Sequence, residues 1–270
     1  SGDGQFTWPV QMVRDDDENL YVTDEALHRI SVFDREGKFL SKWGVHGSGD
    51  GEIDRPSGIS FDPDGNLWIA DGLNHRLQKF TKNGRHLGGF GTYGKGQGEF
   101  DMPWGIEVDE RGDVYVVDWR NDRVQKFSSD GEFLMEFGSS GTGNGEFNRP
   151  AGICVDSDGD IYVVDRGNHR VQQFNPEGNY VDKFVGDATV GKMARTYIMA
   201  SAKVLRLREM ADLETAKRLR SPTSVRVDDQ GRLYIADFGC HRIQVYKKES
   251  YPLGPLDIIP EPASPDLYTV

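Results

Sequence analysis

The sequence has few cysteines and no long apolar run, and both absences narrow the class of protein. Only two cysteines occur in 270 residues, Cys154 and Cys240. They follow no disulfide-framework spacing, so we expect two free thiols. No run approaches 18 consecutive apolar residues, which argues against a membrane-spanning helix. We therefore expect a soluble protein with no membrane span, and no targeting segment is visible that would indicate a compartment.

Positive charge and catalytic motifs are also scarce. The chain has 32 Lys and Arg against 44 Asp and Glu, a net charge of −12. Because phosphate binding depends on basic surface, we do not expect a nucleic-acid partner. The G-x-S-x-G, H-E-x-x-H and phosphate-loop patterns are all missing. The sequence therefore predicts no cofactor and leaves open whether the protein is an enzyme.

What the sequence does have is a repeat. In each copy an Asp ends a hydrophobic run, and an Arg follows that Asp at a fixed offset. The first four copies are spaced 47 residues apart, and the fifth comes after an insertion of 25 further residues. Such recurrence indicates a repeat architecture and favours a structural role for the pair. The pairs are Asp24 and Arg29, Asp71 and Arg76, Asp118 and Arg123, Asp165 and Arg170, and Asp237 and Arg242.

One copy of the repeat predicts four short strands. Residues 103–138 contain four extended runs, "WGIEV", "VYVVD", "DRVQKF" and "GEFLMEFG", separated by turn segments rich in Gly, Asp and Asn. This pattern is typical of a four-stranded antiparallel meander. A meander repeated at this period predicts an all-β fold, a β-propeller of four-stranded blades. Five repeats are present, and the ring is expected to have five or six blades.

The repeated segments also carry a family resemblance. "NHRLQKF" (74–80), "NDRVQKF" (121–127) and "NHRVQQF" (168–174) each follow a run that ends in Asp. They resemble NHL repeats across about residues 9–246, which implies a β-propeller, most often six-bladed. The opening "GDGQFTWP" matches the later linkers, so the chain starts where a preceding blade would end, and a sixth blade before it stays an open alternative.

We expect a single domain over residues 1–270. The fifth repeat shows no obvious fourth strand, and either tail is a candidate to supply it. The predicted parts are repeats at about 9–55, 56–102, 103–149, 150–186 and 222–250, a helical insertion at 187–220 and a C-terminal tail at 251–270.

Two patterns invite a metal interpretation, and we expect a metal at neither. Histidines recur in the NHL segments, but they sit at equivalent places around a ring too wide for one ion. Residues 156–160, "DSDGD", look like half a calcium loop, yet the ligand spacing fails and a hairpin turn fits better. The repeat histidines are His28, His75, His169 and His241.

The resemblance includes enzymes, the peptidyl-hydroxyglycine amidating lyases. In that family zinc is held by histidines, some of them two residues after the Pro that begins a blade. Here this slot holds no metal ligand of the required kind, so the resemblance to the lyases stops at the scaffold. The slot residues are Gln11, Gly58, Gly105, Gly152 and Ser224.

Residues that depart from the repeat are better functional candidates. The middle slot of the first strand holds Glu107 in one repeat and Arg226 in another, and first strands line a propeller's channel. The two charges are either channel residues for a ligand or an ordinary ion pair between blades. Three tryptophans, Trp8, Trp104 and Trp119, lie in loops or at the start of repeats, where aromatic side chains suit recognition as well as packing.

The insertion at 187–220 is the largest departure. It contains no Pro, is rich in helix formers and places apolar residues at helical spacing. It has eight Lys and Arg against four Asp and Glu, so a basic helical arm is predicted on an acidic body. The predicted topology puts the arm on the face that carries the "NHR" loops, where it is either a lid or docking element or a helix that only packs on the rim.

Together these observations predict a binding module. Its partner would be a protein, a peptide or a small ligand on the face with the insertion. Glu107, Arg226, Trp104, Trp119 and Trp8 are the candidate ligand-binding residues. The alternative is a propeller-type hydrolase or lyase with its site at the mouth of the central channel.

Overall fold

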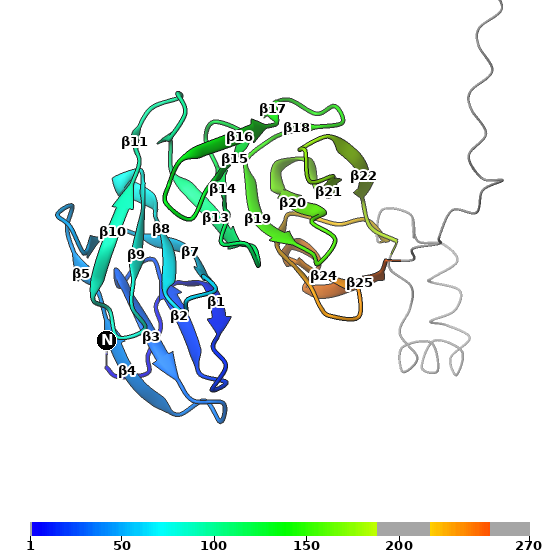
Figure 1. The fold of residues 1–270 in the computed structure, drawn as a ribbon. Coiled ribbons are helices and arrows are strands. Elements are labelled where there is room, and N and C mark those ends of the chain that lie inside the picture. Colours follow the sequence, from blue (N-terminus) through cyan, green and yellow to red (C-terminus); the bar gives the residue numbers. More distant parts are fainter. Residues whose placement is uncertain (1, 188–216, 249–270) are drawn as a thin grey trace, which may run out of the picture.

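The computed structural model describes residues 2–187 and 217–248. These residues form five antiparallel sheets set side by side in an arc, so the molecule is an all-β propeller with five blades (Figure 1). Within each sheet the strands follow chain order, as a meander requires. The predicted all-β propeller and the predicted strand order are therefore confirmed, and the described residues contain the five predicted repeats as five blades.

The blades have these strands. Blade 1 contains β1 (Pro9–Arg14), β2 (Leu20–Asp24), β3 (Arg29–Phe33) and β4 (Phe39–Trp43). Blade 2 contains β7 (Pro56–Phe61), β8 (Leu67–Asp71), β9 (Arg76–Phe80) and β10 (His86–Phe90). Blade 3 contains β13 (Pro103–Val108), β14 (Val114–Asp118), β15 (Arg123–Phe127) and β16 (Phe133–Phe137). Blade 4 contains β19 (Pro150–Val155), β20 (Ile161–Asp165), β21 (Arg170–Phe174) and β22 (Tyr180–Phe184). Blade 5 contains β23 (Pro222–Val227), β24 (Arg232–Asp237) and β25 (Arg242–Lys247).

Short parallel ladders form where one blade leads to the next. Each ladder joins two residues after the fourth strand of a blade to two residues just before the following blade. The ladders are β5 (Val45–His46) with β6 (Glu52–Ile53), β11 (Thr92–Tyr93) with β12 (Glu99–Phe100), and β17 (Ser139–Ser140) with β18 (Glu146–Phe147).

Strand register defines two faces of the propeller. In blade 3, Pro103 at the start of β13 lies opposite Asp118 at the end of β14, and Asp118 lies opposite Arg123 at the start of β15. The start of each first strand, the loop between the second and third strands, and the linkers thus share one face, which we call the linker face. The opposite face carries the turns between first and second strands, and we call it the turn face.

The core lies between neighbouring blades. The first strands are innermost and pack in series, β7 on β13, β13 on β19 and β19 on β23. Ile59 and Ile106, which share one slot of the first strand, are fully buried. β-Branched and aromatic residues dominate these strands because they fill the pleated surface between two sheets.

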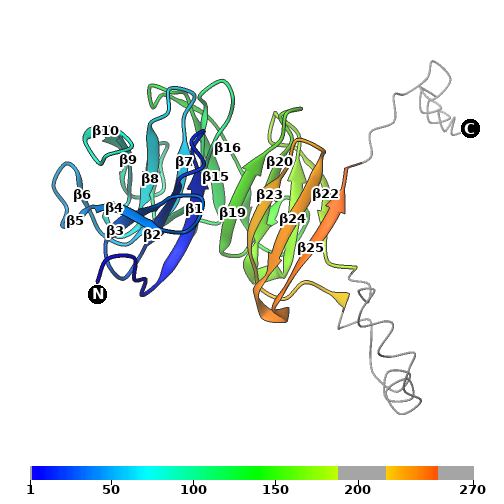
Figure 2. The ribbon, with the colours of Figure 1, turned by 90° about the horizontal axis from the view of Figure 1, so that it is seen from below.

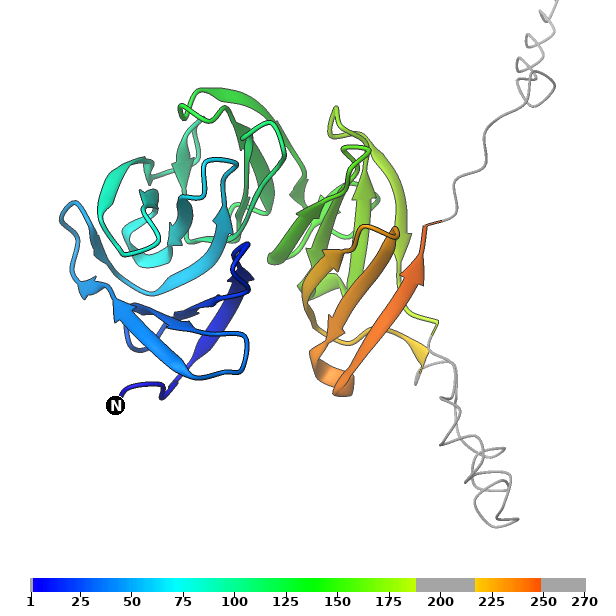
Figure 3. The same ribbon diagram turned by 60° about the horizontal axis from the view of Figure 1, so that its bottom comes forward.

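The two ends of the arc differ from its middle. Figure 3 shows blade 1 and blade 5 on the two sides of an opening in the ring. Met12 of β1 occupies the same slot as Ile59 yet is 61% exposed. In β25, Ile243 is 66% exposed, whereas Val171 in the matching slot of blade 4 is fully buried. Figure 2 shows β25 as the outermost strand of blade 5.

The insertion leaves blade 4 and returns to blade 5 through a narrow stem. The Leu219 N–H donates to the Val185 carbonyl at 2.9 Å, so the two ends of the segment lie side by side. The predicted helix at 187–220 lies mostly outside the described residues, as does the tail at 251–270. A fourth strand for blade 5 is not found between residues 217 and 248.

The expectation for the cysteines is met. Cys154 and Cys240 are free thiols, as predicted. Within residues 2–187 and 217–248, no helix is long and apolar enough to cross a membrane.

Candidate functional site

The repeated Asp and Arg form a buried network that ties each blade to the linker before it. In blade 3, the Arg123 Nε lies 3.0 Å from Asp118 Oδ2, while Asp118 Oδ1 accepts the Asp101 backbone N–H at 2.8 Å. The Arg123 Nη2 donates to the carbonyls of Gly96 and Glu99 at 2.8 and 3.0 Å. Burial raises the pKa of the Asp118 carboxyl, and the surrounding donors oppose that rise. One ion pair therefore fixes both a turn and a linker.

The same network recurs in three other blades and changes in the first. The Asp–Arg distance is 2.9 Å in blade 2 and 2.7 Å in blades 4 and 5. In blade 1, Asp24 instead accepts the backbone N–H groups of Thr7 and Trp8. Arg29 donates to the Gln5 carbonyl at 2.7 Å, and its buried Nε has no partner. The structure thus brings four of the five predicted pairs into direct contact.

The repeat histidines also serve the linkers. The Nδ1 of His75 accepts the Met102 N–H at 3.1 Å, and the Nδ1 of His169 accepts the Ser221 N–H at 3.0 Å. In the third blade Asp122 occupies the position of the histidine, and its carboxylate accepts the Arg149 N–H at 2.7 Å. This shared hydrogen bond gives the repeated position a reason to hold His or Asp without any ion.

The channel residues predicted from the first strand do meet. The Arg226 guanidinium of β23 donates to the Glu107 carboxylate of β13, which lies two blades away. Cys154 of β19 lies fully buried between those blades. Burial raises the pKa of the Cys154 thiol well above its ordinary value, and the Glu107 charge adds to the rise. The Arg226 and Glu107 charges form an ion pair with each other. The raised pKa keeps the Cys154 thiol protonated.

A hollow surrounds this pair on the inner side of the ring. Its lining comes from the first strands of four blades, so it belongs to the central channel. The lining residues are Met12, Val13, Arg14, Ser60, Phe61, Glu107, Val108 and Arg226.

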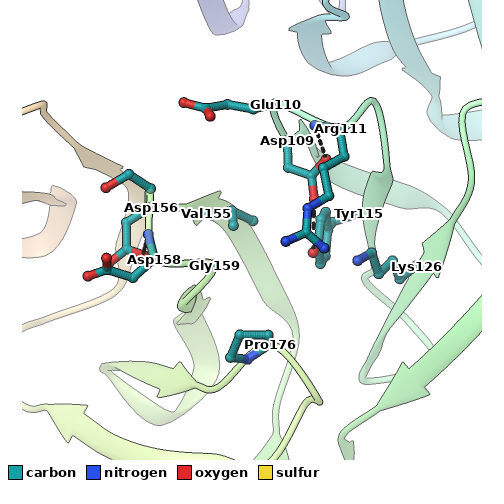
Figure 4. Close-up of a pocket in the computed structure, with 11 residues that line it drawn as sticks. Asp109, Glu110, Arg111, Tyr115, Lys126, Val155, Asp156, Asp158, Gly159 and Pro176 are labelled. Atoms are coloured by element: carbon teal, nitrogen blue, oxygen red, sulfur yellow. Dashed lines mark hydrogen bonds between the residues drawn. The ribbon is translucent and has the colours of Figure 1, made fainter.

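A second hollow opens between blades 3 and 4 on the turn face. Figure 4 shows Asp109, Glu110 and Arg111 on one side of it and Asp156 and Asp158 on the other. The Oδ1 of Asp156 accepts the N–H groups of Asp158 and Asp160, each at 3.0 Å, so "DSDGD" is a hairpin turn, as predicted.

Sequence analysis missed the cation at this turn. The Lys248 Nζ lies 2.8, 2.8 and 2.9 Å from carboxylate oxygens of Asp156, Asp158 and Asp160. These three carboxylates raise the pKa of the Lys248 ammonium well above its ordinary value. Lys248 lies 88 or more residues after this turn, and no local pattern connects the two.

Two of the three candidate tryptophans form a patch. The rings of Trp104 and Trp119 lie 5.7 Å apart, and both are partly exposed. The Arg149 guanidinium lies 4.7 Å from the Trp119 ring centroid and that of Arg120 lies 5.6 Å away. We call these four residues the Trp–Arg patch. Trp8 stands apart in sequence, before β1, with 63% of its surface exposed.

Comparison with known proteins agrees with this geometry. A family model described as NHL repeat matches residues 54–80, 100–127, 147–174 and 219–246. These segments coincide with the end of the linker and the first, second and third strands of blades 2 to 5. The chain belongs to the NHL-repeat β-propeller family. No curated protein matches the chain.

Solved structures share the fold of this NHL propeller at low identity. A streptogramin B lyase structure is 13% identical with a TM-score of 0.57, over 90% of this chain and 70% of that one. Virginiamycin B lyase from Staphylococcus aureus is 14% identical with a TM-score of 0.57, over 91% and 72% of the two chains. A nidogen/laminin complex is 19% identical with a TM-score of 0.58, over 88% and 75%. At these identities the likeness concerns the fold alone.

Proposed function

We propose that this NHL propeller is a binding module that recognises a peptide segment of a partner protein on its linker face. The observation that carries the proposal is the Trp–Arg patch. Trp and Arg are the residues that most often dominate protein interfaces, because they offer large contact area together with directed hydrogen bonds. All four patch residues come from the start of a first strand, a loop between second and third strands, or a linker, so all belong to the linker face.

The charge of the patch favours an acidic segment. Arg149 is exposed and, within residues 2–187 and 217–248, has no carboxylate partner. Arg120 lies 3.5 Å from the Asp101 carboxylate and is half exposed. A segment that carries carboxylates beside an apolar residue would pair with the guanidinium groups and cover the indole rings.

The channel supports binding more than catalysis. Glu107 and Arg226 are the residues that an acid–base mechanism would use, and they form an ion pair with each other. Cys154 is buried with a raised pKa, so it lacks the thiolate character of a nucleophile. The pair instead forms a structural ion pair that links blades 3 and 5.

The insertion belongs to the same proposal. Val185, just before the insertion, and Leu219, near its end, lie at the linker position between blades 4 and 5 and hence on the linker face. Residues 187–220 carry eight Lys and Arg against four Asp and Glu. A basic segment on this face would add to the attraction for an acidic partner.

The test is a peptide selection against the purified chain. A phage-displayed library of random peptides would be panned on wild-type protein and counter-selected on a Trp119→Ala, Arg149→Ala variant. We expect enriched peptides with Asp or Glu beside an apolar residue, binding the variant at least about tenfold more weakly, as loss of hot-spot residues predicts.

Arg111→Ala provides the matched control. Arg111 is exposed like Arg149 but lies at a turn between first and second strands, on the turn face. This variant should bind the selected peptides as wild type does. Equal binding by all three proteins, or no enrichment at all, would contradict the proposal.

The alternative, a hydrolase or lyase at the channel mouth, requires a different residue. It needs Glu107 as its acid or base, so Glu107→Gln would abolish turnover. The same substitution should leave peptide binding at the Trp–Arg patch unchanged, because the patch does not include the channel pair.

A further inference from the structure

A cluster of metal-type ligands lies at the linker between blades 1 and 2. His28, His46 and Asp54 each offer one ligand atom, and the three atoms all lie within 4.8 Å of one another. The Asp54 Oδ1 is 3.2 Å from His28 Nδ1 and 3.6 Å from His46 Nε2. We infer that these three residues form a binding site for a divalent transition metal, with Zn²⁺ as the best-suited ion.

The spacing suits a tetrahedral ion. Zinc binds imidazole nitrogen and carboxylate oxygen at about 2.0–2.2 Å, which places neighbouring ligand atoms roughly 3.3 Å apart. Both distances from the Asp54 Oδ1 lie near this value. Two imidazoles and one carboxylate are a typical zinc ligand set, and a fourth position stays open for water.

Three separate backbone elements hold the ligands in place. His28 ends the loop between β2 and β3 in a left-handed conformation with φ of 49°. His46 pairs with Ile53 in the β5–β6 ladder, which sets it beside Asp54. The Asp54 N–H donates to Asp71 at 2.7 Å. A site supported by ordered backbone is already arranged before the ion arrives.

One hydrogen bond limits the affinity. The His28 Nδ1 accepts the Arg55 N–H at 3.2 Å, so its lone pair is engaged in the absence of an ion. An ion on Nδ1 competes with that hydrogen bond. We therefore expect affinity in the micromolar range rather than the nanomolar range.

The repeat supplies its own comparison sites. The slots of His28, His46 and Asp54 hold His75, Tyr93 and Asp101 one blade later, and Asp122, Ser140 and Asn148 in the next. In the third set, the Ser140 hydroxyl donates to Asp122 at 2.7 Å instead. The linker between blades 1 and 2 is thus the one of these three that combines two histidines with a carboxylate.

This inference departs from the expectation of no metal. The four repeat histidines lie in different blades, whereas His46 and Asp54 lie in the linker beside His28. His28 lies beside His46 and Asp54 in the linker between blades 1 and 2, so the site needs no histidine from another blade.

The site can be tested by zinc titration of tag-free, chelator-treated full-length protein. Calorimetry should show one equivalent of Zn²⁺ per chain with a micromolar Kd. Cobalt(II) should give the visible absorption of a tetrahedral complex, and saturating zinc should raise Tm because it binds only the folded chain.

His46→Tyr is the decisive variant, because it copies the residue found one blade later. The His46 side chain is 64% exposed, so the substitution should not disturb folding. It should weaken zinc binding at least about tenfold, since even loss of a residue behind a ligand costs 10–100-fold. His169→Ala, which removes a repeat histidine outside the cluster, should bind zinc as wild type does.

Two results would overturn the inference. One is wild-type protein that binds no zinc at 100 µM, a concentration roughly 10–100 times the expected Kd. The other is a His46→Tyr variant whose zinc affinity and Tm shift equal those of wild type.

Discussion

The inner blades and the end blades share one repeat but not one burial pattern. Ile59 and Ile106 are fully buried, whereas Met12 in the same slot of blade 1 is 61% exposed. Val171 is fully buried, whereas Ile243 in the same slot of blade 5 is 66% exposed. The comparison teaches that a blade does not bury its own apolar side chains. Each slot is buried only where a neighbouring sheet lies against it.

The polar network sets blade 1 apart from the rest. In blades 2 to 5 Arg Nε reaches the repeat Asp at 2.7–3.0 Å. In blade 1 the Arg29 Nε has no partner, and Asp24 bonds to backbone N–H groups instead. Inner blades should therefore contribute more stability than blade 1.

The largest expected effect is on the inner ion pair. Arg123→Ala leaves the Asp118 carboxylate buried without its guanidinium and frees two linker carbonyls. We expect the free energy of unfolding to fall by about 3–5 kcal/mol, measured by urea denaturation. Arg29→Ala in blade 1 should cost clearly less. Equal losses at the two positions would break the comparison.

The next effect concerns the first-strand core. Ile106→Ala creates a cavity among fully buried side chains and should lower the free energy of unfolding by about 2–5 kcal/mol. Met12→Ala, at the same slot in blade 1, should cost less than about 1 kcal/mol because most of its side chain already contacts solvent. A large loss for Met12→Ala would mean that another surface covers β1 in solution.

Deleting the insertion should have a smaller effect. Residues 188–216 would be replaced by a short Gly-rich linker, keeping the hydrogen bond between Leu219 and Val185. We expect a folded propeller with nearly unchanged Tm, because the hydrogen bond between Leu219 and Val185 already joins the two ends of the segment. Loss of cooperative thermal unfolding would instead show that the insertion is part of the core.

The smallest effect is a pH dependence at an end blade. Asp228 is surrounded by donors, including Arg232 at 2.7 Å, and its pKa is lowered to about 2. A carboxyl whose folded pKa is depressed stabilises the fold above its unfolded pKa, and this stabilisation is lost as pH falls from about 3.8 towards 2.

Asp228→Asn removes this contribution. Wild type should therefore lose more Tm than the variant between pH 5 and pH 2, measured by thermal denaturation at several pH values. Parallel Tm profiles for the two proteins would contradict the assignment.

Several features of the fold could be predicted from the sequence because they repeat or are local. The Pro that begins β7, β13 and β19 and the Asp that ends β8, β14 and β20 recur every 47 residues. Alternation of apolar and polar residues predicts strands, and Asp–Gly turns predict hairpins, since both depend on neighbouring residues. The "DSDGD" hairpin was predictable for this reason.

The candidate sites were only partly predictable. Glu107 and Arg226 stood out because they break the repeat, and Trp104 and Trp119 because aromatic residues at strand starts and loops are informative. Arg149 gave no such signal, because Arg also precedes the Pro at Arg55, and only the packing of one linker over Trp119 made it part of the patch.

The sequence by itself determined the blade, its turns and its family, because these depend on contacts within about 47 residues. Tertiary structure alone decided which equivalent slots are covered, which charges meet and which histidine lies beside a second histidine and a carboxylate. Met12 and Ile59 differ in their neighbours, not in their slot. Arg226 reaches Glu107 across 119 residues. His46 approaches His28 and Asp54 only because a two-residue ladder folds the linker back on the loop. Burial and proximity are properties of the assembled arc, and no single repeat contains them.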